Sequence, residues 1–356
     1  PTWDTSDRGT AGMRIAHVML SRGWGGAERF VLDLAKGISE DGHEQLVVVR
    51  QAFDRWEALE AIPGVSVCRI PARGNWDFFS VPPMVAAGKR FQPDLVHGNM
   101  ARGSWMAGRL GKSLGIPVLI TLHNYIRRKY CRNVDYFATI TRDAARYVEG
   151  WGIPADRVRW IPNFSTFPPV EAPDLFRTEP PTFVALGRFV HDKGFDLLLR
   201  ALRTTLDQAG PARLILAGAG PEEAALRSLS RSLGLDEYVD FTGWVEDVMA
   251  FYARGDVFVL SSRHEPFGIV LLEAMAAGKA IVSSLAEGPR EVLDEGTAFL
   301  ATLDSADSLA DAMVRSIQDR EESVRRAEAG LDLYRDRYQA DKVIPQYLAY
   351  YRDIIG

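Results

Sequence analysis

Two glutamates, eight positions apart, mark the stretch of the sequence with the clearest potential for chemistry. Glu265 opens the tetrapeptide Glu-Pro-Phe-Gly after an apolar run at 257–260, and Glu273 lies within a later apolar segment. The pattern predicts a strand, a loop, a helix beginning near Gly268 and a second strand at 280–282. The free N–H groups of such a helix start favour a phosphate. A carboxylate among apolar neighbours, as predicted for Glu273, needs donors such as the hydroxyl groups of a sugar or ribose.

Either acid alone is typical of a solvated loop or helix residue, but their combination with Pro-Phe-Gly is more specific. It resembles the retaining, nucleotide-sugar-dependent glycosyltransferases with the GT-B fold, the glycosyl transferases of group 1. The resemblance implies that Glu273 binds the ribose hydroxyl groups of a donor. It also implies that Glu265 and the backbone of Phe267, Gly268 and Ile269 face the donor sugar and its phosphates.

A glycine-rich turn at residues 23–29 follows the first predicted strand. Glu28 stands where the dinucleotide-binding fingerprint needs its third glycine, so that fingerprint is absent. A tight strand-to-helix turn would explain the glycines equally well. The resemblance implies instead that Gly25 and Gly26 approach the donor phosphates and sugar.

Arg188 and Lys193 flank a short loop between a predicted strand and a helix. Exposed cations are common in loops, but two here can neutralise a diphosphate leaving group without a metal. The resemblance implies that this pair holds the donor diphosphate, and that Val245 contacts the nucleobase through its backbone. Nearby Asp247 would either accept hydrogen bonds from a guanine or cap the following helix.

His123 ends a predicted buried strand, and ligands of open α/β sheets bind beyond the carboxyl ends of the strands. A lone histidine is more often structural. The resemblance implies a histidine close to the donor sugar, where a neutral imidazole can bind a hydroxyl group or carry a proton. His97 is predicted at another strand end near the same edge, with no assigned role.

The segment that follows His123 is basic, with Arg127, Arg128 and Lys129 close to Tyr125 and Tyr130. A solvated loop would account for this charge. We predict an acceptor-side patch for an anionic substrate such as a phosphorylated glycolipid; contact with an anionic membrane surface is the other interpretation.

The composition is that of a soluble globular protein, with 356 residues, 47% of them hydrophobic and 25% charged. The net charge of −5 argues against a nucleic-acid partner. The two cysteines, Cys68 and Cys131, lie far apart and favour a reducing compartment over a disulfide framework or zinc site. No apolar run approaches the roughly 18–20 residues of a membrane helix. We therefore predict a cytoplasmic protein. Peripheral contact with the inner face of the membrane is a second prediction.

The alternation of strands and helices predicts an α/β protein of two Rossmann-like domains that face a central cleft. Residues 1–12 are polar and are predicted to form a disordered leader before Met13. A proline-rich linker separates an N-terminal domain, 13–165, from a C-terminal domain, 166–339. The aromatic segment 340–356 is predicted to return to the first domain. The first domain would bind the acceptor and the second the nucleotide sugar, with domain closure bringing them together.

The resemblance implies an enzyme that transfers a hexosyl group with retention of configuration. The expected donor is a UDP-sugar, with GDP-mannose as the second choice. The expected acceptor is a glycan or glycolipid of cell-envelope polysaccharide or lipopolysaccharide assembly.

Glu265 and His123 are the predicted catalytic residues. The chain contains no Asp-x-Asp, so the metal-bound diphosphate site of the other main glycosyltransferase fold is not indicated, and no metal or further cofactor is expected. A sugar-nucleotide epimerase on the same fold and a non-catalytic sugar-nucleotide-binding subunit are the alternatives.

Overall fold

The computed structural model describes residues 12–21, 23, 25–72, 78–177 and 179–356. The chain divides into two compact units, one comprising Pro1–Phe164 with Ala340–Gly356 and the other Ser165–Gln339. The predicted leader lies outside the described residues except for Gly12.

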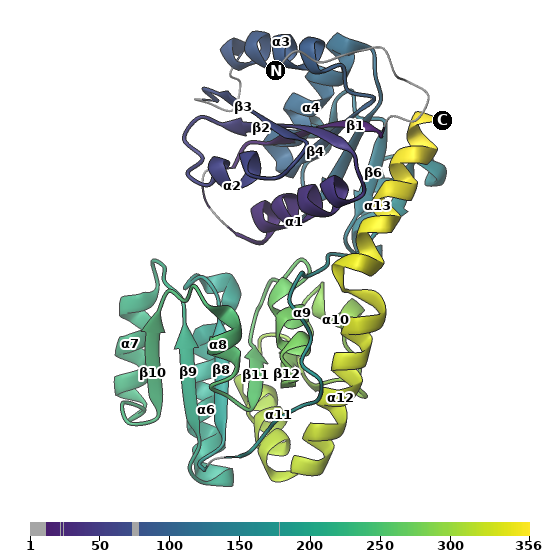
Figure 1. Cartoon of the computed structure of the whole chain (residues 1–356). Coiled ribbons are helices and arrows are strands. Elements are labelled where there is room, and N and C mark those ends of the chain that lie inside the picture. Colours follow the sequence, from purple (N-terminus) through teal and green to yellow (C-terminus); the bar gives the residue numbers. More distant parts are fainter. Residues whose placement is uncertain (1–11, 22, 24, 73–77, 178) are drawn as a thin grey trace. The chain divides into compact units, whose positions relative to one another are not determined.

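The first unit is built on a parallel sheet of seven strands in the order β3-β2-β1-β4-β5-β6-β7 (Figure 1). Helices cover both faces, and a hydrophobic core lies on each face. Apolar runs buried on both faces are typical of such strands, as at 47–49 in β2. The strands are β1 (Arg14–Met19), β2 (Glu44–Arg50), β3 (Val65–Ile70), β4 (Leu95–Asn99), β5 (Val118–Leu122), β6 (Tyr136–Thr139) and β7 (Val158–Trp160). The helices are α1 (Gly26–Glu40), α2 (Trp56–Glu60), α3 (Val81–Phe91), α4 (Met100–Leu114), α5 (Arg142–Glu149) and α13 (Ala340–Ile355), with short 3₁₀ turns η1 (Phe78–Ser80), η2 (Arg128–Cys131) and η3 (Ala155–Arg157).

The C-terminal helix α13 packs onto the sheet of the first unit through a buried polar network. The Tyr351 hydroxyl group lies 2.8 Å from His97 Nδ1, and the Thr121 hydroxyl group lies 2.8 Å from His97 Nε2. Tyr347 also reaches Thr121, at 3.3 Å. The prediction that His97 lies at a strand end near the ligand edge is therefore wrong. His97 lies inside β4, fully buried under a helix that the chain forms about 250 residues later, which local sequence does not reveal.

Acid is expected to destabilise this unit, because burial keeps three of its histidines neutral. Burial lowers the pKa of His17 to about 4 and that of His123 to about 3, and holds the pKa of His97 well below its usual value. An unfolded histidine binds its proton near pH ~6.5. At pH values between the pKa of the unfolded histidine and that of the folded histidine, the unfolded chain binds more protons than the folded chain does. The stabilisation is therefore complete above the unfolded pKa and is lost as the pH falls toward the folded pKa.

For His17 alone, the loss in the free energy of unfolding by pH 4 is on the order of 3 kcal/mol. Urea unfolding of the wild-type protein and of His17→Leu, at neutral and at mildly acidic pH, measures this contribution. The variant should lose less stability on acidification than the wild type does. Equal losses would contradict the assignment.

The second unit contains a parallel sheet of six strands in the order β10-β9-β8-β11-β12-β13. Helices α6 and α11 contribute to the core on one face, while α9 and α12 pack together and α12 contacts β12. The strands are β8 (Thr182–Leu186), β9 (Arg213–Ala217), β10 (Val239–Gly243), β11 (Val257–Leu260), β12 (Ala280–Ser284) and β13 (Phe299–Ala301). The helices are α6 (Phe195–Ala209), α7 (Glu223–Ser232), α8 (Val248–Tyr252), α9 (Ile269–Ala276), α10 (Pro289–Val292), α11 (Ala306–Gln318) and α12 (Arg320–Arg337), with the 3₁₀ turn η4 (His191–Lys193).

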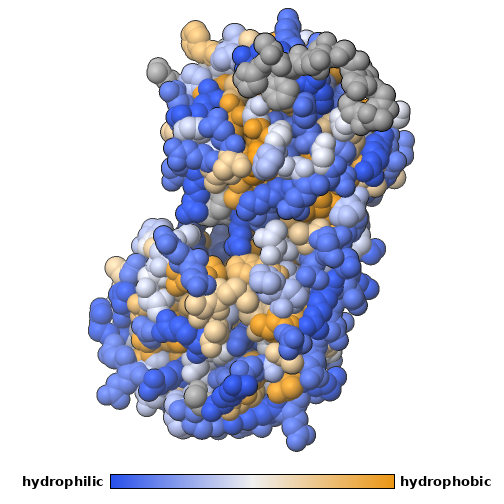
Figure 2. Space-filling model, viewed as in Figure 1, coloured by the Kyte–Doolittle hydropathy of each residue, from blue (hydrophilic) through white to orange (hydrophobic). Residues whose placement is uncertain are grey.

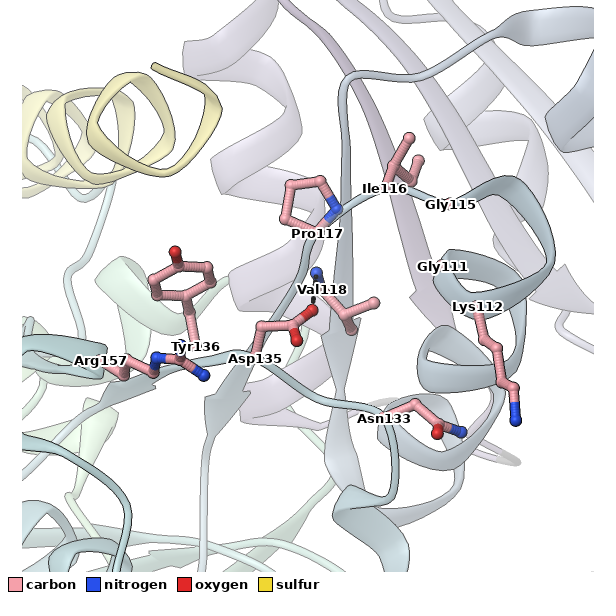
Figure 3. A pocket seen from close by; sticks show the side chains of 10 residues that line it. All are labelled: Gly111, Lys112, Gly115, Ile116, Pro117, Val118, Asn133, Asp135, Tyr136 and Arg157. Carbon is pink, nitrogen blue, oxygen red and sulfur yellow. Dashed lines mark hydrogen bonds between the residues drawn. The ribbon is translucent and has the colours of Figure 1, made fainter.

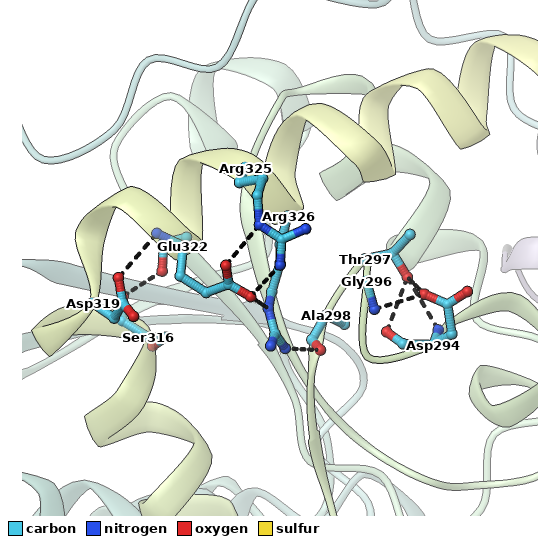
Figure 4. Close-up of polar contacts among 10 residues, drawn as sticks. Asp294, Gly296, Thr297, Ala298, Ser316, Asp319, Glu322, Arg325 and Arg326 are labelled. Atoms are coloured by element: carbon cyan, nitrogen blue, oxygen red, sulfur yellow. Dashed lines mark hydrogen bonds and ion pairs between the residues drawn. The ribbon is translucent and has the colours of Figure 1, made fainter.

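Polar contacts attach α12 to the segment that leads into β13 (Figure 4). Arg326 donates to the carbonyl oxygen of Ala298 at 2.5 Å and pairs with Glu322 at 2.6 Å. Asp319 caps the helix by accepting from the N–H of Glu322 at 3.0 Å. The bond from Arg326 to Ala298 joins this long helix to the segment before the edge strand β13, and the other two contacts stabilise the first turns of the helix itself.

The described residues of the predicted linker, 165–177 and 179–181, form no helix or strand beyond an isolated bridge between Ser165 and Gln339. Among the bonds that hold this segment are two to a buried carboxylate: Asp256 accepts from the N–H of Phe176 at 2.6 Å and from the N–H of Thr182 at 2.8 Å. The linker is thereby tied to the amino end of β11, within the second unit.

Hydrophilic residues predominate on the surface in Figure 2, with apolar residues in small groups among them. Across the described ranges, no helix combines the length and the apolar character needed to cross a membrane.

Candidate functional site

The predicted site in the second unit lies on loops that follow three neighbouring strands, β8, β11 and β12. Since these strands are parallel, their carboxyl ends share one edge of the sheet, and the loops that leave them meet there. The Ser261 hydroxyl group donates to the carbonyl oxygen of Lys193 at 2.9 Å, and the Ser284 hydroxyl group donates to that of Ser262 at 2.6 Å. The loops are therefore bound to one another before any ligand arrives.

Lys193 and Glu265, predicted separately from the sequence, form an ion pair in the structure. Lys193 Nζ lies 2.5 Å from Glu265 Oε2, and the Ser262 hydroxyl group lies 3.4 Å from the same oxygen. Glu265 is only 7% exposed, so its charge is compensated mainly by this lysine. An ammonium group has three N–H donors, which leaves further donors of Lys193 for an anionic ligand.

Arg188 lies in the same loop as Lys193, immediately after Gly187. Its side chain is exposed and has no ion pair among the described residues. An exposed guanidinium that is not engaged by the protein can bind a phosphate through paired N–H groups. Arg188 and Lys193 thus lie near the two ends of the loop between β8 and α6, and their binding of a diphosphate stays a prediction.

A further arginine, Arg263, fixes the loop that carries Glu265. It forms a bidentate pair with Asp196 in the first turn of α6, with both N···O distances 2.7 Å, and also pairs with Asp304 at 2.6 Å. Hydrogen bonding to Arg263 lowers the pKa of Asp196 below its usual value, so this carboxylate is ionised at neutral pH. The N–H of Arg263 donates to the carbonyl oxygen of Asp192 at 2.8 Å, which binds the loop to η4.

Helix α9 begins as predicted, directly after Gly268. This glycine has φ +92, a left-handed conformation that side chains rarely adopt, and no side chain caps the helix. The N–H of Leu271 donates to the carbonyl oxygen of Gly268 at 2.8 Å, which leaves the N–H groups of Ile269 and Val270 in the first turn for an anion. Phe267 is buried against Tyr338, with the ring centroids 6.1 Å apart, so only its backbone can face a ligand.

Glu273 lies on α9 and is 3% exposed. The residues around it in sequence, 271–276, are all buried, as the apolar pattern predicted. The Tyr252 hydroxyl group lies 2.9 Å from the carbonyl oxygen of Val270 and 3.5 Å from Glu273 Oε2. Glu273 is thus a buried carboxylate held on a rigid helix, an arrangement suited to binding hydroxyl groups.

Val245 is half-buried and follows β10, which is the edge strand of the sheet and is separated from β8 by β9. Asp247, for which the sequence left two roles open, caps α8 by accepting from the N–H of Ala250 at 2.9 Å. The helix cap therefore uses one oxygen of this carboxylate.

In the first unit, His123 follows β5 and contacts two neighbouring elements. Its Nε2 lies 2.9 Å from Asn99 Oδ1 at the end of β4, and its ring lies 4.7 Å from that of Phe30 on α1. Because an amide oxygen only accepts, Nε2 donates and Nδ1 is the acceptor of a neutral ring. Burial lowers the pKa of His123 to about 3, which favours the predicted hydroxyl-binding role over proton transfer.

The glycine turn and the basic segment share this edge of the first sheet, since both follow the carboxyl ends of strands. Gly25 and Gly26 are exposed at the start of the 15-residue helix α1, which no side chain caps; Arg22 and Trp24 lie outside the described residues.

The basic segment enters η2 directly after Arg127, and the side chains of Arg127, Arg128 and Lys129 are exposed. Tyr125, two residues before Arg127 in the sequence, packs edge-on against Tyr147, with the ring centroids 5.1 Å apart.

Both halves of the chain match models of known protein families. Residues 170–332 match the model described as glycosyl transferases group 1, and residues 24–164 match glycosyltransferase family 4. The lipopolysaccharide core biosynthesis glycosyltransferase LpsD of Rhizobium meliloti is 31% identical over 350 residues, covering 94% of this chain and 97% of the relative. The chain belongs to the group 1 glycosyltransferases. A second relative from R. meliloti, the lipopolysaccharide core biosynthesis glycosyltransferase LpsE, is 30% identical over 343 residues, covering 94% of this chain and 98% of the relative.

Solved structures of glycosyltransferases share the fold. HepE of Anabaena, determined with UDP and glucose, matches with a TM-score of 0.79 at 22% identity, over 96% of this chain and 100% of that one. A glycosyltransferase of Rickettsia africae matches with a TM-score of 0.83 at 18% identity, over 97% and 99% of the two chains. The prediction of a GT-B fold is confirmed.

Two pockets of this glycosyltransferase lie away from the predicted site residues. A pocket of about 520 Å³ in the first unit lies near the amino ends of β5 and β6 (Figure 3). Lys112 and Asn133 line one side of it and Tyr136 and Arg157 the other, while Asp135 accepts from the N–H of Val118 at 3.0 Å. A pocket of about 590 Å³ in the second unit lies near the amino ends of β8, β9 and β10. No predicted site residue lines either pocket.

The sequence predicts no role for two residues beside Glu265. His264 and Glu287 form a pair at 2.7 Å, and Glu287 also accepts from the N–H of Glu265. The signal in the sequence was the Glu-Gly-Pro at 287–289, three residues after the end of β12.

Proposed function

We propose that this glycosyltransferase moves a hexosyl group from a nucleotide diphosphate sugar to a glycan or glycolipid acceptor, with retention of configuration and without a metal ion. A UDP-sugar is the favoured donor and GDP-mannose the second choice. The Lys193–Glu265 ion pair beside the uncapped start of α9 carries the proposal. The two R. meliloti relatives named for lipopolysaccharide core biosynthesis support an acceptor in lipopolysaccharide or related envelope polysaccharide assembly.

On the donor side, the roles follow from the charges on the three loops. Arg188, the free donors of Lys193 and the N–H groups at 267–269 bind the diphosphate, while buried Glu273 accepts from the ribose hydroxyl groups. Glu265, held by Lys193, faces the sugar. One pre-positioned donor to a developing negative charge contributes about 3–4 kcal/mol to catalysis. These cations and N–H groups would therefore supply much of the charge stabilisation that the leaving group needs.

The reaction then proceeds on one face of the sugar. The bond between the anomeric carbon and the diphosphate oxygen breaks, and the acceptor oxygen bonds to the same face. The acceptor proton passes to the departing diphosphate, so no protein base is required. The carboxylate of Glu265 stabilises the positive charge that develops on the sugar, and neutral His123 binds a sugar hydroxyl group through Nδ1.

On the acceptor side, Arg127, Arg128 and Lys129 bind anionic groups of the acceptor. Support comes from their exposure and from their position on the loop after β5, four to six residues beyond His123. An acceptor that is part of a growing glycolipid would bring the enzyme to the cytoplasmic face of the inner membrane, where the same cations can contact anionic headgroups.

Thermal unfolding with UDP, GDP, ADP and their common sugar conjugates, with and without EDTA, tests this function. A nucleotide at about 100 times its dissociation constant stabilises the folded state by roughly 2.7 kcal/mol. We expect one nucleotide, UDP before GDP, to raise the melting temperature equally with and without EDTA. An effect that EDTA abolishes would overturn metal independence, and a shift with NAD alone would overturn the function.

A further inference from the structure

Glu287 and His264 form a side-chain pair at the edge of the donor site. His264 immediately precedes Glu265, and Glu287 lies in the loop between β12 and α10. His264 Nδ1 lies 2.7 Å from Glu287 Oε1, and because a carboxylate only accepts, Nδ1 donates.

The second oxygen of Glu287 holds the backbone of Glu265. Oε2 lies 3.2 Å from the Glu265 nitrogen and accepts its N–H. Burial alone would raise the pKa of Glu287, but hydrogen bonds from its own N–H, from His264 and from the Glu265 N–H outweigh burial and lower it. Glu287 is therefore an ionised acceptor that uses its two oxygens for two different partners in the same loop.

Gly288, the residue after Glu287, also bonds to the backbone of Glu265. The N–H of Gly288 donates to the carbonyl oxygen of Glu265 at 2.8 Å. A Cβ at Gly288 would lie 2.3 Å from the Phe267 Cα, so the two loops are in direct backbone contact. The N–H and the carbonyl oxygen of Glu265 are thus both held by residues 287 and 288, while its carboxylate is held by Lys193. Of these two bonds to the backbone of Glu265, only the one accepted by the Glu287 carboxylate involves a side chain, so only this bond can be removed by substitution.

We infer that Glu287 and His264 are positioning residues, which hold the 264–268 loop so that Glu265 and the start of α9 meet the donor sugar and diphosphate. The inference rests on the proposed function, because it names the residues that shape its donor site. The His264 ring acts through its Nδ1–H bond to Glu287, and an asparagine, whose side-chain N–H₂ lies near the position of Nδ1, should replace it.

The test compares Glu287→Ala, His264→Ala and His264→Asn with the wild type, and uses Glu295→Ala as the control because Glu295 is an exposed acid in the turn before β13. Displacing a group by about 1 Å can cost on the order of 100-fold in rate. We expect Glu287→Ala to lower kcat by about that factor and His264→Ala by about 10-fold, with a smaller change in UDP affinity. The kcat of His264→Asn and of the control should stay within about threefold of the wild-type value. The kcat of the variant that combines Glu287→Ala with His264→Ala should be no lower than that of Glu287→Ala alone, because each substitution removes the same side-chain pair.

Two results would overturn the inference: Glu287→Ala with wild-type kcat, or His264→Asn as impaired as His264→Ala, which would show that the ring itself acts on the substrate. If Glu287→Ala does not fold, the comparison of the two His264 variants still decides the question.

Hydrogen exchange over 262–268 in the ligand-free protein separates this inference from the proposed function. Exchange should be faster in Glu287→Ala than in the control whatever the substrate is, and equal exchange would contradict the positioning role. A wild-type enzyme that binds no nucleotide would instead refute the proposed function.

Discussion

Replacing Lys193 by alanine is expected to lower kcat/KM on the order of 10³-fold. The substitution removes a cation from the leaving diphosphate. It also leaves Glu265 as a buried carboxylate without its ion-pair partner, 2.5 Å away in the intact protein. The lost cation weakens binding of the donor diphosphate and also the stabilisation of the leaving diphosphate in the transition state, so kcat should fall as well as donor affinity. Steady-state kinetics with the donor identified by thermal unfolding measures the change.

Lys342→Ala is the matched control, because Lys342 is an exposed lysine on α13 whose only ion pair among the described residues is with the adjacent Asp341. It should leave kcat/KM unchanged. If Lys193→Ala retained wild-type UDP affinity and turnover, the diphosphate site would have to be sought elsewhere.

Replacing Glu273 by glutamine is expected to weaken binding of the nucleotide itself, about 10- to 100-fold, because hydrogen bonds to a charged acceptor contribute roughly 1.5–3 kcal/mol. Glutamine has nearly the same volume, so the packing of α9 around this buried position should survive. The loss should appear with UDP as well as with the intact donor, since the ribose is common to both. Isothermal titration of the wild type and the variant with UDP provides the measurement.

A nucleotide that lacks both ribose hydroxyl groups gives the control for this prediction. If Glu273 binds those hydroxyl groups, the wild type should bind 2′,3′-dideoxy-UDP as weakly as Glu273→Gln binds UDP. The variant should then show no further loss with the dideoxy nucleotide. Additive losses would mean that Glu273 acts on another part of the donor.

Local sequence was sufficient for features set by neighbouring residues. The start of α9 at Gly268 could be predicted because a glycine there permits the left-handed backbone, and the burial of Glu273 because its neighbours are apolar. The α/β class followed from short apolar runs that alternate with amphipathic helices, each of which buries its apolar residues against a sheet.

Contacts between distant segments could not be predicted in the same way. Lys193 and Glu265 are 72 positions apart, and each on its own resembles a solvated loop residue. The burial of His97 is decided by Tyr351 of a helix more than 250 residues later. Glu287 gains its role from β12 lying beside β11 in the sheet, a neighbour relation that the sequence of either strand does not specify.

The anomeric configuration of the product, followed by ¹H NMR in the presence of EDTA, tests the central claim most directly. We expect an α-configured nucleotide sugar to yield an α-linked product, or α-hexose as the first hydrolysis product, at the same rate with and without EDTA. A β-linked product would contradict the retaining mechanism, and a reaction that stops in EDTA would contradict the assignment of the diphosphate charge to Arg188, Lys193 and the start of α9.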